Sequence, residues 1–329
     1  MKNTIKKVIL FTLFSAFAFS FALFSGCSGS GNGETHDPLT VEFVQNGQTK
    51  ASVTVGYGEK IDENNVTKPE AEKENCVTEW NFDFDLPVYE NATINTVVYT
   101  QGLSFSKSLK GDFYLVSGYN GEVADLFLPD FYKGKQVTGI KSDAFKRNQT
   151  IVSVRFPSQL VSVADGAFKS CHGLTEVILP DTVTTIGASA FEDCTSLVSF
   201  KIPPLVKVIS SRMAQGHKYD FLSVPEGVTV IESYAFASHM SKIVLPVSLK
   251  RIEYVGIWAN LRQIFYAGSE YDWIKVDVSS EPYTGTGNFT FSAKSITMDI
   301  AALYFYSENA PVRHGNYWHY VSGEPTIWE

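Results

Sequence analysis

The sequence predicts a mainly β protein with short helical turns, in which a small β-grasp-like domain precedes a solenoid of about six to seven coils of about 22–23 residues. Three sets of positions recur in register. Prolines recur at intervals of 28, 23, 23, 22 and 21 residues, at Pro129, Pro157, Pro180, Pro203, Pro225 and Pro246. Aliphatic residues recur at intervals of 23, 23, 23, 22 and 21, at Ile140, Val163, Ile186, Ile209, Ile231 and Ile252. Five residues later comes a ring position, occupied by Phe145, Phe168, Phe191, Ala214, Phe236 and Ile257.

The clearest repeat spans residues 174–196 and predicts the course of one coil. Residues 174–179 are expected to form a short strand, which Pro180 ends because proline has no N–H for the ladder. Residues 183–186 form a second extended stretch, and residues 189–193 form a short helical corner. Each coil buries its aliphatic and ring side chains only against its neighbours.

Two repeats depart from this pattern. Ala214 and Ile257 replace the ring, and residues 212–219 lose the cysteine and leucine positions of the repeat. We expect both coils to be locally irregular.

Residues 113–278 carry the motif I-x-x-x-A-F-x-x-C-x-x-L-x-x-V-x-L-P, which resembles the BspA-like leucine-rich repeats of bacterial surface proteins. Asp272-Trp273, which follows residues 264–268, also resembles a common end of such arrays. The resemblance implies a leucine-rich-repeat solenoid that binds rather than catalyses.

Cys171 and Cys194 occupy the same position in adjacent coils, and Asn148 fills that position one coil earlier. We expect stacked buried thiols, with a disulfide as the alternative that the geometry allows. Cys76 is expected to be a half-buried free thiol.

The first 27 residues predict an export signal. Residues 1–7 carry three lysines, residues 8–24 are apolar, and Ser25-Gly26-Cys27 follows. A transmembrane anchor is the alternative, because 17 apolar residues come close to the ~20 needed to span a bilayer. The end of the run resembles a lipobox, with Phe24 where the family usually has Leu. The resemblance implies a signal peptide at 1–26, lipidation of Cys27 and a flexible Gly/Ser tether over 27–38.

Residues 39–100 predict a small separate β domain. Two alternating stretches flank Asn46-Gly47, which indicates a β-hairpin. The segment resembles the Listeria–Bacteroides repeat domain, a β-grasp-like module of bacterial surface proteins. The matching residues are Val41, Phe43, Asn46, Gly47, Val55, Tyr57, Gly58, Glu59, Trp80, Pro87, Val88, Asn91, Ala92 and Thr93. Residues 101–112 are expected to be a linker.

The tail, residues 279–329, is rich in tryptophan and tyrosine, and we expect it to cap the open end of the solenoid. An aromatic platform for carbohydrate is the alternative interpretation.

No residue pattern predicts catalysis, a metal site or a cofactor. The six histidines have no partners at ligand spacing. Asp83 and Asp85 are expected to be solvated rather than to bind calcium. Removal of residues 1–26, which carry three lysines and no acidic residue, takes the formal charge from −8 to −11. Nucleic acid is therefore an unsuitable partner.

The strands before each proline predict a binding face. Side chains six, three and one residues before the proline point inward, and those four and two residues before it point outward. The outward positions vary in charge and size, as binding surfaces of solenoids do. The candidate ligand-binding residues are Arg155, Glu176, Ile178, Lys201, Phe221, Lys242, Val244 and Phe265.

Together these patterns predict a non-enzymatic, lipid-anchored recognition protein of the cell envelope, in the outer membrane if the cell has two membranes. Its expected partner is a host or bacterial surface protein or a glycan. A structural spacer and an accessory subunit that presents a hydrolase to its substrate are the alternatives.

Overall fold

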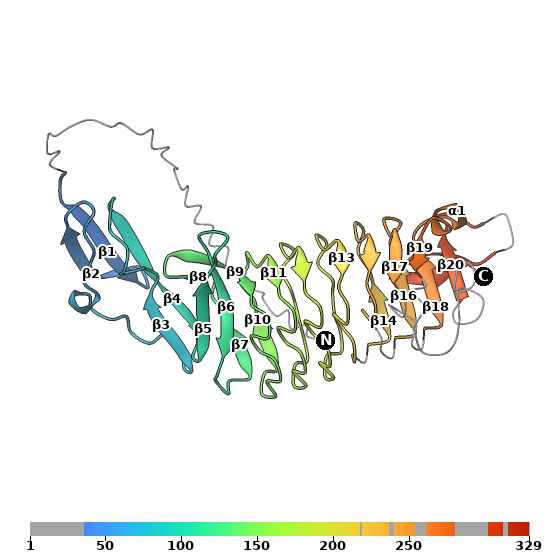
Figure 1. Cartoon of the computed structure of the whole chain (residues 1–329), viewed down its shortest axis with the longest axis horizontal. Helices are drawn as coiled ribbons and strands as arrows, with labels where there is room; N and C mark the ends of the chain where they lie inside the picture. Colours follow the sequence, from blue (N-terminus) through green and yellow to red (C-terminus); the bar gives the residue numbers. More distant parts are fainter. Residues whose placement is uncertain are drawn as a thin grey trace, which may run out of the picture. The chain divides into compact units, whose positions relative to one another are not determined.

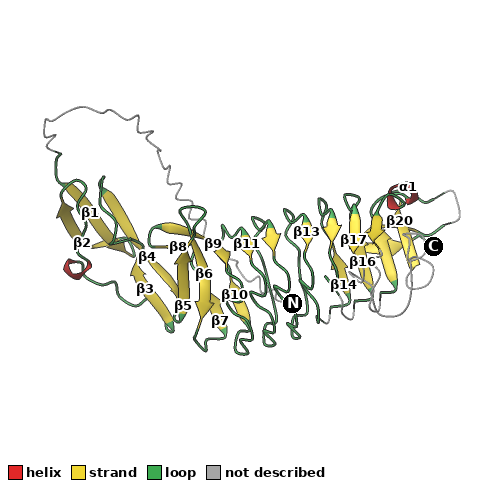
Figure 2. Cartoon of the chain, viewed as in Figure 1, coloured by secondary structure: helices red, strands yellow, loops and turns green. Residues whose placement is uncertain are grey.

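The computed structural model describes residues 36–217, 219–236, 240–253, 261–279, 302–311 and 315–328. Cys27 and Ile257 lie outside these residues. The chain divides into two compact units, Met1–Asp37 and Pro38–Glu329, and the elements below belong to the second. Strands dominate, with little helix (Figure 2). Within the described residues, no helix has the length and apolar character needed to cross a bilayer.

A four-stranded sheet comes first. Its strands are β1 (Leu39–Gln45), β2 (Gln48–Val55), β3 (Cys76–Trp80) and β4 (Ala92–Thr100). The strand order is β2-β1-β4-β3, with β1 and β4 parallel in the centre, which is the β-grasp arrangement. A single 3-10 turn, η1 (Glu63–Asn65), stands where a β-grasp has its helix. The hairpin turns at Asn46 and Gly47, which both have positive φ, as the sequence predicts.

The solenoid follows, with two ladders of short parallel strands, one on each long side of the coils (Figure 1). The ladder before the prolines contains β7 (Asp125–Phe127), β10 (Ser153–Arg155), β14 (Phe221–Ser223), β16 (Lys242–Leu245), β18 (Gln263–Tyr266) and β20 (Ala302–Tyr306). The second ladder contains β6 (Tyr114–Tyr119), β9 (Lys135–Ile140), β11 (Ser162–Val163), β12 (Thr185–Ile186), β13 (Val208–Ile209), β15 (Val230–Ile231), β17 (Arg251–Glu253) and β19 (Asp277–Ser279). The remaining elements are β5 (Leu103–Lys107), β8 (Phe131–Tyr132), α1 (Glu270–Trp273), β21 (Tyr317–Val321) and β22 (Glu324–Ile327).

The core is a set of columns that run from coil to coil. Leu174, Val177 and Leu179, the predicted inward residues of one repeat, are buried, and their counterparts in the other repeats form the same cluster. The rings of Phe145, Phe168 and Phe191 are stacked, with centroids 4.7 and 5.3 Å apart. The predicted inward positions are therefore confirmed.

The third corner of each coil differs from the short helix that the sequence suggests. Ser189 and Asp193 adopt left-handed conformations, with φ of 57° and 59°. In these conformations every second N–H group points toward the next coil of the solenoid. The N–H groups of Ser189, Phe191 and Asp193 therefore donate to carbonyls of that coil, at 2.9, 3.0 and 2.7 Å. A helix would use the same N–H groups within the coil and would leave the stack without these hydrogen bonds.

The β-grasp-like domain contacts the first coil directly. The segment predicted as a linker contains β5, which pairs antiparallel with β6, so that prediction needs correction. Lys133, at the tip of the β8–β9 hairpin, lies 3.7 and 3.8 Å from the carboxylates of Asp83 and Asp85. The two acids are therefore not merely solvated, and the side chain of Asp83 is only 15% exposed. The buried Thr100 hydroxyl accepts the N–H of Phe127 at 2.7 Å.

We predict that Phe168→Ala destabilises the solenoid by about 3–5 kcal/mol, because it leaves a cavity between two stacked rings. The urea midpoint of circular dichroism would measure this loss. Phe131→Ala, at a ring that is 42% exposed, is the matched control and should shift the midpoint little. Equal shifts in the two variants would contradict a stabilising ring column.

Candidate recognition surface

The outward side chains of the ladder before the prolines form two columns, and we call this surface the strand face. Phe221, Lys242 and Gln263 pair in register across β14, β16 and β18. Ser223, Val244 and Phe265 form the second column on the same strands. The same alternation holds at the other end, where Ser153 and Arg155 pair with Asp125 and Phe127.

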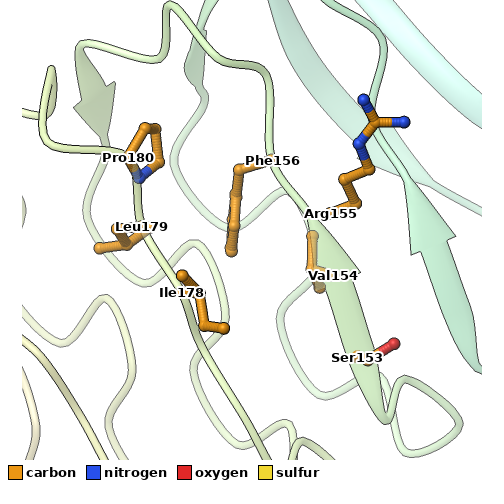
Figure 3. Close-up of a pocket in the computed structure, with 7 residues that line it drawn as sticks. All are labelled: Ser153, Val154, Arg155, Phe156, Ile178, Leu179 and Pro180. Carbon is orange, nitrogen blue, oxygen red and sulfur yellow. The ribbon is translucent and has the colours of Figure 1, made fainter. Parts of the chain in front are cut away.

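At its first end, the strand face is occupied by contacts within the protein. The guanidinium carbon of Arg155 lies 4.4 Å from the centre of the Phe127 ring, which is a cation–π contact. Ser153 donates a hydrogen bond to Asp125. A shallow hollow of about 470 Å³ lies beside these residues and is lined by Phe156 and by Ile178 of the next coil. Figure 3 shows that the Arg155 side chain points away from Ile178.

The middle of the strand face is open. A groove of about 730 Å³, which we call the central groove, spans three successive coils. Its rim carries Glu176, Ile178, Lys201 and Phe221, four of the predicted binding residues. Ile178 is 69% and Phe221 36% exposed, and Val198 beside them is 71% exposed. Glu176 and Lys201 form no ion pair within the described chain, so both charges face solvent.

At the last end, the strand face is covered, which corrects two predicted site residues. Val244 and Phe265 lie in the expected column but are only 3% and 2% exposed. Trp318 of β21 packs against both of them, and its indole N–H donates to the Tyr266 carbonyl at 2.9 Å. The C-terminal strands extend the sheet beyond β18 and place this ring over its outer face. Lys242, in the other column, remains exposed.

The central groove lies over a break in both ladders. Among the described strands, β12 pairs only with β11, and β13 pairs only with β15, so the second ladder is interrupted between these two coils. On the strand face the same coils share one isolated bridge, Val177 to Phe200. The coil that contains Ala214 is therefore irregular, as the sequence predicts.

One interpretation of this coil needs correction, because its cysteine and leucine positions are filled rather than lost. His217 stands 23 residues after Cys194 and takes the cysteine position. Tyr219, which is 5% exposed, takes the leucine position. One residue separates it from His217, whereas two residues separate Cys194 from Leu197 in the preceding coil. The regular spacing points to His217, but histidine is not one of the apolar residue types that the repeat has at this position, so the residue type itself gives no signal.

The cysteine position forms a column of hydrogen bonds between coils. The Cys171 thiol donates to the Phe145 carbonyl at 3.1 Å, and the Cys194 thiol donates to the Phe168 carbonyl at 3.2 Å. Both thiols are free and buried, which confirms the predicted stack. Burial raises the pKa of Cys171 to about 12 and also raises that of Cys194, so both stay protonated donors.

His217 continues this column. Its Nε2 lies 2.6 Å from the Phe191 carbonyl, and since a carbonyl only accepts, Nε2 carries the proton. The other ring nitrogen, Nδ1, is buried and has no hydrogen-bond partner within the described residues. Burial, opposed by the Phe191 hydrogen bond, lowers the pKa of His217 to about 4.

The remaining predicted features contribute no chemistry at this surface. The described residues contain no group of three histidine, cysteine or acidic side chains that could hold a metal ion. His319 stacks on Trp328 with ring centroids 3.7 Å apart, and His172 hydrogen-bonds to Gln149. The arrangement offers charged and apolar contacts for binding.

Six repeat copies over residues 127–255 match the sequence profile of the BspA type Leucine rich repeat region. The repeat region is a leucine-rich-repeat solenoid. This kind of repeat suggests a protein-binding or recognition role. No curated protein matches the chain.

Solved structures of bacterial leucine-rich-repeat proteins are similar to the chain. A T. pallidum protein is 24% identical, with 50% of this chain and 79% of that chain covered and a TM-score of 0.48. A Bacteroides ovatus protein is 17% identical, with 62% and 70% covered and a TM-score of 0.44. A leucine rich cell surface protein of Faecalibacterium prausnitzii is 22% identical, with 55% and 43% covered and a TM-score of 0.37.

We predict that the protein loses stability as the pH falls from about 6.5 to about 4. In this range His217 binds a proton in the unfolded chain, where its pKa is ordinary, but stays neutral in the folded coil, where its pKa is lowered. Below the folded pKa the loss levels off, and its full size is at most about 3 kcal/mol. Urea midpoints across this range would measure it. His217→Cys restores the residue of the neighbouring coils and should remove this part of the pH dependence, whereas identical slopes would contradict the role of His217.

Proposed function

We propose that this protein recognises a protein partner through the central groove of its solenoid. The observation that carries the proposal is that three exposed apolar side chains, Ile178, Val198 and Phe221, line one groove on a rigid repeat frame. A rigid repeat loses little conformational entropy when exposed side chains bind a partner, so apolar anchors there contribute most of their contact energy.

The charges beside these anchors favour binding to one specific partner over non-specific attachment to surfaces. Glu176 and Lys201 stand on the same rim and have opposite signs. A partner with complementary charges would be oriented by them, and a partner with the opposite arrangement would be repelled. The chain itself is acidic, with a formal charge of −8, which disfavours a polyanionic partner such as nucleic acid.

We further propose that the protein is exported and anchored by a lipid on Cys27, with adhesion to host or bacterial cells as its role. The support is the sequence of residues 1–33, in which a basic start and an apolar run precede Ser25-Gly26-Cys27 and a Gly/Ser stretch. A flexible tether would let the solenoid reach a partner away from the membrane.

Two other roles remain alternatives to adhesion. A structural spacer of the envelope would need no exposed apolar anchors, so Ile178 and Phe221 argue against it. An accessory subunit of a surface hydrolase would use the same groove to hold the enzyme, and co-purification of a hydrolase would favour this role.

Substitutions in the central groove test the proposal. Ile178→Asp and Phe221→Asp should each weaken binding of the labelled protein to target cells at least about 10-fold, because each buries a charge in place of an apolar anchor. Charge reversal at Glu176, Lys201 or Lys242 should change binding less, mainly through association rate. Val161→Asp, at a 43% exposed side chain of the second ladder, is the matched control. Binding that survives both groove variants would refute the site.

Protease treatment of intact cells tests the location separately. An antibody against residues 113–278 should lose its signal without cell lysis if the solenoid faces outward. Protection until the envelope is opened would exclude adhesion and favour an internal scaffold.

A further inference from the structure

The C-terminal end of the strand face carries a second exposed surface, which is aromatic. Tyr304 of β20 pairs in register with Phe265 of β18, and Tyr306 pairs with Trp318 of β21. Strand alternation puts Tyr320 on the same side as Trp318. Tyr306 is 38% and Tyr320 50% exposed. The strand face therefore ends in tyrosine rings, whereas the central groove is lined by a mixture of aliphatic, aromatic and charged side chains.

A buried tryptophan holds these two rings in place. Trp318 is 0% exposed, and its indole N–H is fixed by the Tyr266 carbonyl. Its ring centroid lies 5.2 Å from that of Tyr306 and 4.9 Å from that of Tyr320, with edge-to-face angles of 71° and 74°. The tyrosines thus rest on a rigid base, and a ligand that stacks on them need not order them first.

Groups that can form hydrogen bonds with hydroxyls of a ligand lie at this surface. The hydroxyls of Tyr306 and Tyr320 form no hydrogen bond within the described chain. Burial, then the neighbouring Tyr306 and then Glu226 raise the pKa of Tyr320, so its phenol stays protonated and can donate as well as accept a hydrogen bond.

Charge selects the class of ligand. Strands β20, β21 and β22 contain no lysine or arginine, so they offer no counter-charge to an anionic ligand. Acidic groups at the rim of a protein partner would likewise find no complement on these strands. Sugars have one face of C–H groups, which stacks on aromatic rings, and hydroxyls around the edge, which need donors and acceptors.

The geometry points to a binding site for a neutral polysaccharide, with sugar rings stacked on Tyr306 and Tyr320 and sugar hydroxyls bonded to the two phenols. This site is separate from the central groove. The sequence alone suggested an aromatic platform, but its tryptophans are used as supports: Trp318 is buried, and the Trp328 indole N–H donates to the Ser307 carbonyl at 2.9 Å. The exposed tyrosines are the contact residues.

Electrophoresis of the full-length protein in gels that contain a soluble polysaccharide would test the site. We expect β-glucan, xylan or galactomannan to retard the protein, and alginate, an acidic polymer, to leave its mobility unchanged. Tyr306→Ala and Tyr320→Ala should each weaken retardation by up to about 10-fold, since this is the upper range of what stacking on one aromatic ring contributes. Tyr320→Phe should lose less, because it keeps the ring. Tyr271→Ala, at a tyrosine that is 69% exposed on α1, is the matched control.

Nitration of the unmutated protein with tetranitromethane provides a second readout that does not depend on the folding of a variant. The bound polymer should protect Tyr306 and Tyr320, while Tyr271 stays reactive.

The proposal is overturned if none of the three neutral polymers retards the protein, or if retardation persists in the double alanine variant with Tyr306 and Tyr320 unprotected. Loss of partner-cell binding in that double variant without any polysaccharide binding would instead assign the surface to the protein interface. Ile178→Asp and Phe221→Asp should leave retardation unchanged, so failure of the central groove and failure of this site are distinguishable.

Discussion

The column of hydrogen bonds between successive coils is the constraint on which the rest of the solenoid depends. A thiol or imidazole in one coil donates to the carbonyl of the ring residue in the preceding coil, from Cys171 through Cys194 to His217. That carbonyl also accepts the backbone N–H three residues later in its own coil, so the thiol or imidazole provides its second hydrogen bond, which contributes about 0.5–1.5 kcal/mol. Each ring residue is therefore fixed at both its side chain and its backbone. The coil spacing follows from these contacts, and the outward side chains inherit the same spacing.

The side chains of the strand face can vary because the packing inside the solenoid is tightly constrained. Because the inward columns and the corners account for the packing and the backbone hydrogen bonds, the outward positions can vary without loss of the fold. Coil-to-coil variation at Glu176, Ile178 and Lys201 is therefore compatible with one and the same fold. The coil of His217 is different, since its interior also departs from the repeat. Its ring position holds Ala214, and the aromatic packing shifts to Phe200, His217 and Tyr219.

Periodic features of the fold could be predicted from the sequence, and features made by distant segments could not. The inward and outward positions, the stacked thiols and the irregular coil all follow from a spacing of about 23 residues. Burial of Val244 and Phe265 depends on Trp318, which lies more than 50 residues later and belongs to no repeat. Likewise, residues 101–112 lack a repeat pattern, so their pairing as β5 with the first coil left no periodic signal. Which outward residues are covered and which are exposed therefore depends on tertiary contacts with segments outside the repeats.

The break in both ladders beneath the central groove connects binding to stability. A repeat protein resists unfolding through the contacts between neighbouring coils, so the joint between β12 and β13, where these strands do not pair, is expected to open more readily than the joints with paired strands. The groove above this joint has walls from the coils on both sides of it. A partner bound to Ile178 on one side and Phe221 on the other would hold those coils together, and it would stabilise the folded form in proportion to its affinity. The least regular coil is thus the place where a bound partner has most to add to the stability of the solenoid.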